Sequence, residues 1–270
     1  VIMKYKLGLN GATIPSADLE TGLRAAAGAG FEAYEPRYHT LLKVLAKGEA
    51  LAVNQLRCDL GLSWLPLNAL EINFESPRVA IFSKAIPMFR DAARAGIHAI
   101  IVCPARSKVN ITVAEGCLRA LAKEAKQYHV DLYFELLGFP DRPFRRLREA
   151  VALAKESGVL LVLDTFHLTV SGVDPDEIIS LPSDLIGIVH LSDALIEGRT
   201  LSELQDEDRV LPGEGGISLV PLLIAIKETG YQGPISVEVF HPKYGKQDPF
   251  KVAQEAFERA QNVLQKAGWR

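Results

Sequence analysis

Short apolar runs alternate with longer amphipathic segments along the whole chain. The apolar runs are rich in aliphatic and β-branched residues and show little polar alternation, which is typical of strands buried on both faces. We therefore predict eight strands of one parallel sheet, at residues 6–10, 31–35, 61–67, 99–103, 131–135, 160–164, 186–190 and 235–239.

The amphipathic segments between these runs predict helices. A capped helix start is expected at residues 16–20 (Ser-Ala-Asp-Leu-Glu), and the glycines within residues 28–30 end that helix. Gly96, Gly158 and Gly230 each lie between a later helix and the next strand, because glycine readily adopts the left-handed conformation of a helix end. The remaining helices are predicted at residues 39–47, 78–95, 112–128, 144–156, 175–181, 219–229 and 250–267.

The regular alternation of strands and helices indicates the fold class. Eight β/α units in 270 residues favour a closed (β/α)8 barrel, the TIM barrel, over an open doubly wound sheet. An open sheet usually has a glycine-rich turn after its first strand, and residues 8–11 do not match that pattern. No linker or change of composition is visible, so we expect one domain that spans residues 1–270. Residues 193–216 lack strong periodicity and are expected to form a long loop at the catalytic face.

Composition and charge narrow the class of protein further. Hydrophobic residues make up 48% of the chain and charged residues 23%, which is ordinary for a soluble globular protein. The net charge of −3 argues against a nucleic-acid partner, which usually requires a basic surplus. Cys58, Cys103 and Cys117 form no CxxC pair and suggest a reducing compartment, and no apolar stretch approaches the roughly 20 residues that span a bilayer. We expect a cytoplasmic protein without membrane contact, and a homo-oligomer is compatible with the sequence.

Four predicted strands in the second half of the chain end in side chains that bind metals. Glu135, Asp164, His190 and Glu238 follow the apolar residues of the fifth, sixth, seventh and eighth strands. A buried strand has no structural use for such an end, because an unpaired buried charge is costly. In a barrel these strand ends meet at one mouth, so the four side chains can surround one cation.

The four strand ends have two interpretations. Any one of these residues by itself is better explained as part of a buried ion-pair network, whereas four in succession favour one divalent metal ion. Three carboxylates and one imidazole suit Mn²⁺, Mg²⁺ or Co²⁺, and Zn²⁺ is also compatible with this ligand set.

Two further residues near the predicted cluster each allow two roles. His167 lies three residues after Asp164, so we expect it past the strand, in the loop, where it could reach the substrate or a second metal. The alternative is a loop histidine packed on Phe166. Asp193 lies three residues after His190 and could accept a hydrogen bond from that imidazole or cap the following segment; the sequence favours neither role.

Other polar and aromatic residues are candidates for substrate binding. The glycine- and proline-rich sequence around Arg209 presents a guanidinium group that suits carboxylate, hydroxyl or phosphate oxygens, although an isolated arginine is more often solvated. Glu35 ends the second predicted strand and is expected to point into the mouth, unless it pairs with the nearby Arg37. Trp64 and Phe139 are candidate apolar walls for the face of a sugar ring, although aromatic residues more often belong to the core.

Five motifs resemble the xylose-isomerase-like TIM-barrel superfamily and, within it, the inosose isomerases of inositol catabolism. They are Phe-Glu-Leu-Leu-Gly (134–138), Asp-Thr-Phe-His (164–167), His-Leu-Ser-Asp (190–193), Arg-Val-Leu-Pro-Gly-Glu-Gly (209–215) and Ser-Val-Glu-Val-Phe-His-Pro-Lys-Tyr (236–244). The resemblance extends over essentially the whole chain, with its specific motifs in the second half. His241 departs from the pattern, since an arginine is expected before this proline in the inosose isomerases.

The resemblance implies a site and a reaction. The four strand-end residues match the single divalent-metal site of the superfamily, and His167 and Arg209 match positions that hold substrate oxygens. In the related ketose 3-epimerases, the glutamates that match Glu135 and Glu238 also move protons. The implied activity is isomerisation or epimerisation of a small-molecule sugar or cyclitol through an enediolate, with an inosose as the first expected substrate.

Other activities of the superfamily remain alternatives. A ketose 3-epimerase would use the same residues, and an inosose dehydratase would form the same enediolate but eject a β-hydroxyl group. A DNA-repair hydrolase similar to endonuclease IV fits less well, because it needs three zinc ions and more histidines than this sequence places at its strand ends. The agreement of the metal, Arg209 and His167 positions argues against a non-catalytic metal- or sugar-binding barrel.

Overall fold

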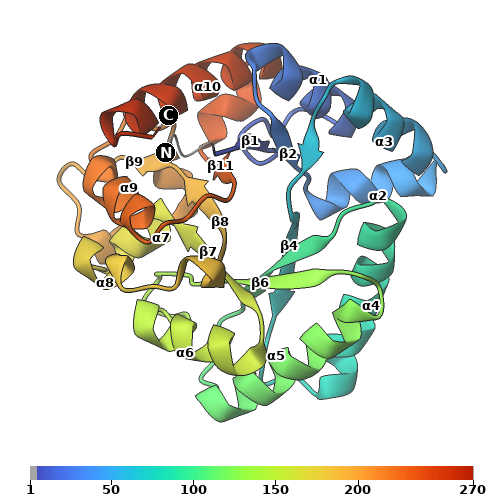
Figure 1. Cartoon of the computed structure of the whole chain (residues 1–270), viewed down its shortest axis with the longest axis vertical. Coiled ribbons are helices and arrows are strands. Elements are labelled where there is room, and N and C mark those ends of the chain that lie inside the picture. Colours follow the sequence, from blue (N-terminus) through green and yellow to red (C-terminus); the bar gives the residue numbers. More distant parts are fainter. Residues whose placement is uncertain (1–4, 270) are drawn as a thin grey trace.

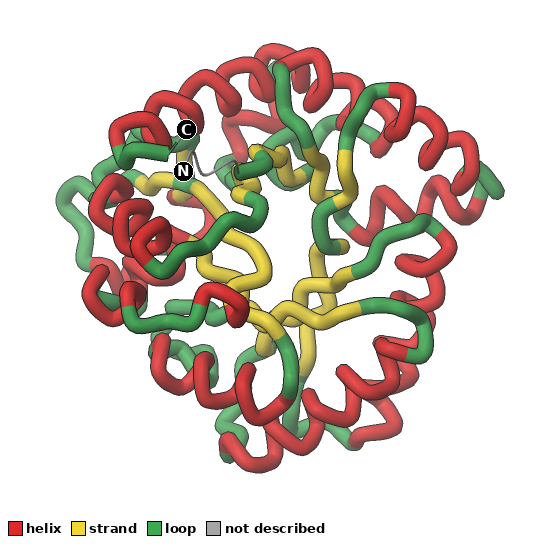
Figure 2. Tube along the Cα trace, viewed as in Figure 1, coloured by secondary structure: helices red, strands yellow, loops and turns green. Residues whose placement is uncertain are grey.

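Parallel strands surround a central axis and helices lie outside them (Figures 1 and 2). The computed structural model describes residues 5–269, and within them nine strands form one sheet in the order β3-β2-β1-β11-β8-β7-β6-β5-β4. Their bounds are Leu7–Asn10 (β1), Ala33–Glu35 (β2), Ser63–Trp64 (β3), Leu67–Ile72 (β4), Ala99–Pro104 (β5), Asp131–Glu135 (β6), Leu160–Asp164 (β7), Ile186–Leu191 (β8) and Ile235–Val237 (β11). The predicted (β/α)8 barrel is confirmed.

The third position of the barrel holds two strands, the two-residue β3 and the six-residue β4, instead of one. β3 pairs with β2, β4 pairs with β5, and a parallel bridge connects Asn68 of β4 with Arg37, which lies just after β2. The sequence predicts a strand only at residues 61–67. β4 is not predicted, because the polar Asn68 and Glu71 interrupt its apolar pattern.

Helices follow most strands and form the outer layer seen in Figure 1. The first one begins after Asp18, whose carboxylate accepts a hydrogen bond from the Thr21 N–H, and ends at Gly30, which has a φ of 100°. No helix in the described part of the chain is long and apolar enough to cross a membrane. The α-helices are Leu19–Ala29 (α1), Tyr38–Ala46 (α2), Ala50–Asp59 (α3), Arg78–Arg94 (α4), Ile111–Lys126 (α5), Leu147–Ser157 (α6), Thr165–Val170 (α7), Pro175–Ile179 (α8), Leu219–Glu228 (α9) and Pro249–Lys266 (α10). Short 3-10 helices are Ser183–Leu185 (η1), Leu201–Glu203 (η2), Asp206–Asp208 (η3) and Pro242–Lys246 (η4).

Three helices differ from the prediction. α6 begins at Leu147 instead of residue 144, because Phe144 has a φ of 56° and therefore lies outside the helical conformation. α3 is not predicted; Val53 is its one buried residue, so the segment lacks a clear apolar face. α7 is not predicted because it starts directly at the end of β7, without an intervening loop.

The long segment after β8 contains more order than its sequence indicates. β9 (Asp193–Ala194) and β10 (Arg209–Val210) pair as an antiparallel ribbon, and η2 and η3 lie between them. Arg209 is paired with Ala194 in this ribbon. This pairing places Arg209, which lies well along the long segment, beside the residues that directly follow β8.

The barrel interior is polar at the carboxyl ends of its strands, and the layer of side chains next to that end is apolar. Gly8 of β1 leaves room for the Leu65 side chain, since a Cβ atom at this position would lie 2.3 Å from it. Side chains two positions apart on a strand face the same side, so Asp164 and His190 lie directly above apolar interior residues. The buried interior cluster consists of Ala33, Leu65, Ile101, Val162 and Ile188.

Candidate metal centre

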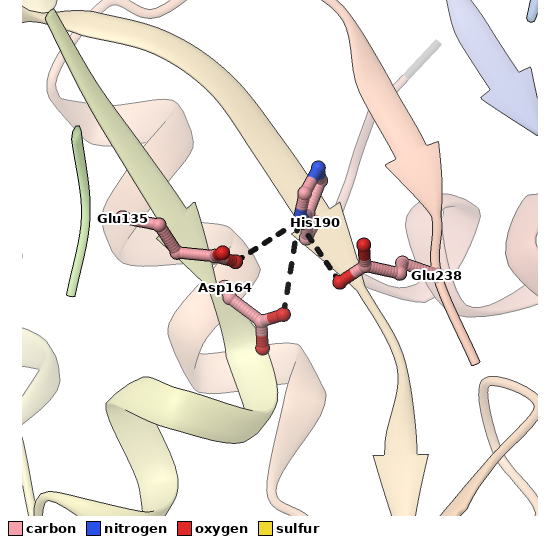
Figure 3. Close-up of side chains that lie close together, drawn as sticks. All are labelled: Glu135, Asp164, His190 and Glu238. Atoms are coloured by element: carbon pink, nitrogen blue, oxygen red, sulfur yellow. Dashed lines mark hydrogen bonds and ion pairs between the residues drawn. The ribbon is translucent and has the colours of Figure 1, made fainter. Parts of the chain in front are cut away.

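The structure brings Glu135, Asp164, His190 and Glu238 together at the carboxyl ends of β6, β7, β8 and β11 (Figure 3). One ligand atom from each residue lies within 4.8 Å of the others, and all four side chains are buried. The Nδ1 atom of His190 is 3.1 Å from Glu238 Oε2, 3.2 Å from Glu135 Oε1 and 3.8 Å from Asp164 Oδ2. This oxygen-rich donor set with one imidazole fits a single Mn²⁺, Co²⁺, Mg²⁺ or Zn²⁺ ion.

Two of the carboxylates have one oxygen held by a neighbour. Asp164 begins helix α7, and its Oδ1 accepts hydrogen bonds from the backbone N–H groups of Phe166 and His167 at 2.7 and 3.0 Å. The Cys103 thiol lies 3.0 Å from Glu135 Oε2 and donates to it. Burial, and then the nearby Glu135 carboxylate, raise the pKa of Cys103 well above its usual value, so the sulfur keeps its proton.

Glu238 is held in the same way by two amide groups. The Nδ2 atoms of Asn10 and Asn68 donate to Glu238 Oε1 at 2.9 and 2.8 Å, which leaves Oε2 facing His190. Each of the three carboxylates thus has one oxygen fixed by the protein and the other toward the centre, and in Asp164 that second oxygen also accepts from Arg209 Nη1. Neither asparagine is predicted from the sequence as a functional residue. Asn10 ends the first predicted strand as the ligands end theirs, whereas Asn68 lies one residue beyond the predicted third strand and had no such signal.

The negative charges of the metal-free site are only partly compensated within the protein, by His190 and Arg209. Burial lowers the pKa of His190, but the carboxylates of Glu238 and Glu35 outweigh burial and raise this pKa well above its usual value. Burial raises the pKa of Asp164, but the Arg209 guanidinium reverses this effect and lowers the pKa to about 2. Burial also raises the pKa of Glu238 to about 7. Because metal ligands must be deprotonated, a bound cation can take the place of the imidazolium proton.

Glu35 has a role that differs from the expected one, and the structure decides between the two alternatives for Asp193. Glu35 does not point into an open mouth: it is fully buried, and its Oε2 lies 3.1 Å from His190 Nε2. Its other oxygen accepts from Asn68, and Arg37 forms no ion pair with it in the described part of the chain. Asp193 is not the acceptor for His190; it binds backbone N–H groups of the long loop instead, at residues 194, 213, 215 and 217.

His167 lies in helix α7, so the expectation that it lies in a loop is wrong. The cause is the Asp164 carboxylate, which caps a helix immediately after the strand. The imidazole is 2% exposed and packs edge to face against Phe139 and Phe166, with ring centroids 5.0 and 5.3 Å away. Its Nε2 lies 3.0 Å from Arg209 Nη2.

Arg209 is buried beside the candidate metal ligands, so it is not a solvated surface arginine. Its Nη1 donates to Asp164 Oδ2 at 2.6 Å and its Nε donates to Asp206 at 2.9 Å. The guanidinium carbon lies 4.4 Å from the Phe166 ring centroid and 5.3 Å from that of Phe240. The arginine therefore connects one ligand of the cluster with the long loop.

The structure does not bring Trp64 to the cluster. Its indole N–H donates to Asn54 Oδ1 at 3.2 Å, and the side chain is half-buried. Trp64 lines a cavity of about 400 Å³ together with Ala99 and Asp131, the first residues of β5 and β6. This cavity lies at the amino ends of these strands, whereas the candidate ligands lie at the carboxyl ends.

The loop that carries Arg209 depends on a close backbone approach at Gly215. A Cβ atom at this position would lie 2.2 Å from the Ala194 carbonyl oxygen and 2.5 Å from Asp193 Oδ1. We expect Gly215→Ala to lower the free energy of unfolding by about 1–3 kcal/mol, because the loop must shift. Chemical denaturation measures this loss. Gly116→Ala in α5 is the control, since nothing lies within 4 Å of its added Cβ; an equal loss in the control would contradict the expectation.

Sequence comparisons identify relatives of this barrel. The family model described as "Xylose isomerase-like TIM barrel" matches residues 23–266. The inosose isomerase of Halalkalibacterium halodurans is 32% identical over 193 residues, which cover 67% of this chain and 67% of that protein. The 3-dehydroshikimate dehydratase of Pseudomonas aeruginosa is 28% identical over 235 residues, or 84% of this chain and 37% of that protein. The chain spans about half the length (52–54%) of the inosose isomerases of three Bacillus species.

A solved structure supports the same relationship. The crystal structure of the IOLI protein with a binding zinc atom is 25% identical to this chain and superposes with a TM-score of 0.87. The superposition covers 98% of this chain and 99% of the IOLI chain. The family model alone extends over more than half of the sequence. The resemblance of the motifs is therefore confirmed, and the chain belongs to the xylose isomerase-like TIM-barrel family.

Proposed function

We propose that this protein is a divalent-metal-dependent isomerase or epimerase of a small sugar or cyclitol, with an inosose as the first substrate to test. One observation carries the proposal: four buried side chains from four strands direct one imidazole nitrogen and three carboxylate oxygens toward the same point. Such a concentration of buried acids is costly unless a cation neutralises it. Relatives named inosose isomerase, and the zinc atom of the IOLI structure, support this choice.

The chain provides two carboxylates for proton transfer. A divalent cation, when bound, polarises the carbonyl group of a substrate and lowers the pKa of the neighbouring C–H group. Glu135 and Glu238 lie on opposite sides of His190 (Figure 3). One of these carboxylates removes the proton next to the carbonyl, and a proton then returns to the enediolate at another carbon or on the other face.

Arg209 and His167 supply the groups that hold substrate oxygens in this proposal. They lie side by side and both adjoin Asp164, so they are next to the candidate metal ligands. The guanidinium group remains cationic at any physiological pH and stabilises the negative charge that develops on an enediolate oxygen. Its pKa is raised by Asp164 and Asp206, although burial has the opposite effect.

Proton NMR in D2O tests the proposed reaction. The protein is stripped of metal, reloaded separately with Mn²⁺, Co²⁺, Zn²⁺ or Mg²⁺, and incubated with scyllo-inosose and a small panel of ketoses. Before spectra are recorded, the metal is removed, since some of these ions broaden the signals. Metal-dependent deuterium uptake next to the carbonyl, together with a new keto isomer, is the expected result. Bound metal without any exchange on any substrate would contradict the proposal.

A dehydratase is the second candidate function. The match to 3-dehydroshikimate dehydratase covers more of this chain (84%) than the match to the inosose isomerase (67%). Both reactions begin with loss of the proton next to a carbonyl, but a dehydratase then expels a β-hydroxyl group. The same NMR spectra separate them, since elimination gives a product that has lost water.

Metal binding is also expected to stabilise the fold. A ligand that binds only the folded state adds about 2.7 kcal/mol when its free concentration is 100 times its Kd. The thermal unfolding midpoint of the stripped protein should therefore rise on addition of one of the four ions and fall again with EDTA. His190→Gln is the control variant and should show little shift. If none of the ions stabilises the wild-type protein, the cluster is an ion-pair network.

A further inference from the structure

A buried carboxylate, Glu35, and a partly buried amide, Asn68, lie directly behind the candidate ligands His190 and Glu238. Glu35 ends β2 and has no exposed surface; its Oε2 lies 3.1 Å from His190 Nε2, on the imidazole nitrogen that does not face the cluster. Asn68 of β4 donates from Nδ2 to both Glu35 Oε1 and Glu238 Oε1, at 3.1 and 2.8 Å. One amide group thus connects the carboxylate behind the imidazole with one of the candidate ligands.

The contact with Glu35 selects one nitrogen of His190. A neutral imidazole carries a proton on one nitrogen and a lone pair on the other. An ionised carboxylate only accepts hydrogen bonds, so Nε2 carries the proton that points to Glu35. The lone pair is then on Nδ1, which is the nitrogen that faces Glu135 and Glu238. The imidazole is therefore oriented for binding a cation at Nδ1.

The contact with Asn68 selects one oxygen of Glu238. Both hydrogens of the Asn68 amide are used, one on each carboxylate, and Asn10 gives a second hydrogen bond to the same Oε1 of Glu238. Rotation of the Glu238 carboxylate would break two hydrogen bonds in a buried site, which is costly. Oε2 consequently stays directed toward His190 and the centre.

We propose that Glu35 and Asn68 are positioning residues for the metal centre: Glu35 sets the tautomer and orientation of His190, and Asn68 sets the orientation of both Glu35 and Glu238. This inference rests on the proposed metal-dependent function and extends it to two residues that are not ligands. It also replaces the expected substrate contact of Glu35. Both of its carboxylate oxygens are already engaged inside the protein, and the side chain is fully buried.

Metal affinity measured by competition with a chelator tests the proposal. Glu35→Gln keeps the volume of the side chain but removes its charge, and we expect about 10–100-fold weaker binding of Zn²⁺. Asn68→Ala should also weaken Zn²⁺ binding. The double variant should weaken it by a factor smaller than the product of the two single factors, because Asn68 and Glu35 are hydrogen-bonded to each other and depend on the same contact. Circular dichroism and thermal unfolding show that each variant is folded before its affinity is measured.

Glu71→Gln is the matched control for charge. Glu71 also lies near the carboxyl end of its strand, β4, but it is 56% exposed and pairs with Arg142. Its replacement makes the same change in net charge without touching His190, so Zn²⁺ affinity should change by less than about threefold. Wild-type protein that binds no metal would overturn the proposed function itself. Tight metal binding by wild type together with equal binding by folded Glu35→Gln would overturn only the positioning role.

A spectroscopic measurement reports on the imidazole directly. In the Zn²⁺-loaded protein with ¹⁵N-labelled histidine, we expect His190 to carry its proton on Nε2 and to show that N–H as a slowly exchanging signal. The signal should shift or exchange faster in Glu35→Gln, because its partner has lost its charge. A proton on Nδ1 in the wild-type protein would contradict the inference, whatever the affinities are.

Discussion

Replacing Glu238 by glutamine is expected to abolish turnover while the barrel remains folded. Glutamine has nearly the same shape, and its carbonyl oxygen can accept the hydrogen bonds that Asn10 and Asn68 now give to Glu238 Oε1. It cannot take up a proton at neutral pH, and its amide nitrogen cannot bind a cation. Loss of a general base lowers the rate by about 10²–10⁴-fold, and the lost ligand adds to this effect.

The deuterium-exchange assay measures this loss on whichever substrate the wild-type protein turns over. Circular dichroism and the unfolding midpoint confirm that the variant is folded. Glu71→Gln serves again as the control, because it removes one negative charge near the carboxyl end of β4 without contacting the cluster. Full activity of Glu238→Gln would eliminate the proposed proton transfer, even if metal binding persisted.

Arg209→Ala is expected to lower the free energy of unfolding of the metal-free protein by about 3–5 kcal/mol. Removal of one partner from a buried ion pair leaves the other charge without compensation. Here the partner is Asp164, 2.6 Å away, and Glu238 lies 3.7 Å from the same guanidinium nitrogen. Denaturant titration with excess EDTA measures the loss. A bound cation should restore part of it, because the metal supplies positive charge to the same carboxylates.

Arg259→Ala is the matched control for this change. Arg259 pairs with Glu214 and Glu255 at 3.1 and 2.9 Å, but it is 36% exposed, so its loss should cost no more than about 1 kcal/mol. Since Arg209 is not a candidate ligand, Arg209→Ala should retain metal while KM rises or kcat falls. An unfolding free energy no lower than that of the control would show that the buried pair contributes little.

Much of the barrel is predictable from local sequence. The apolar runs and the glycines at helix ends depend on residues close in the chain, and the strands that carry Glu135, Asp164 and His190 lie where the pattern places them. The prediction of strands and helices fails where an element depends on contacts that local sequence patterns do not reveal. Asn68 interrupts the apolar pattern of β4 because it reaches the cluster, and α7 exists because the Asp164 carboxylate caps a helix directly at the strand end.

The residues of the candidate site also fall into those that the local sequence indicates and those that only the tertiary structure places. The four strand-end ligands can be recognised because each one interrupts a local apolar pattern. Arg209 could not be distinguished from a surface arginine, because its burial results from the pairing of β10 with β9. Glu35 was placed correctly at a strand end, but its partner His190 lies 155 positions away, so local spacing could not indicate this contact.

The sequence by itself determined the main alternation of eight strands with helices, the barrel class and the residue types that end its strands. These properties follow from short-range periodicity and from the cost of placing a charge at the end of a buried strand. Only the tertiary structure decided which atoms meet. Closure of the barrel brings Asn10 to Glu238 across 228 positions and Asn68 to the same carboxylate across 170. Hydrogen-bond partners depend on distances of about 3 Å, which the packing of the whole barrel sets.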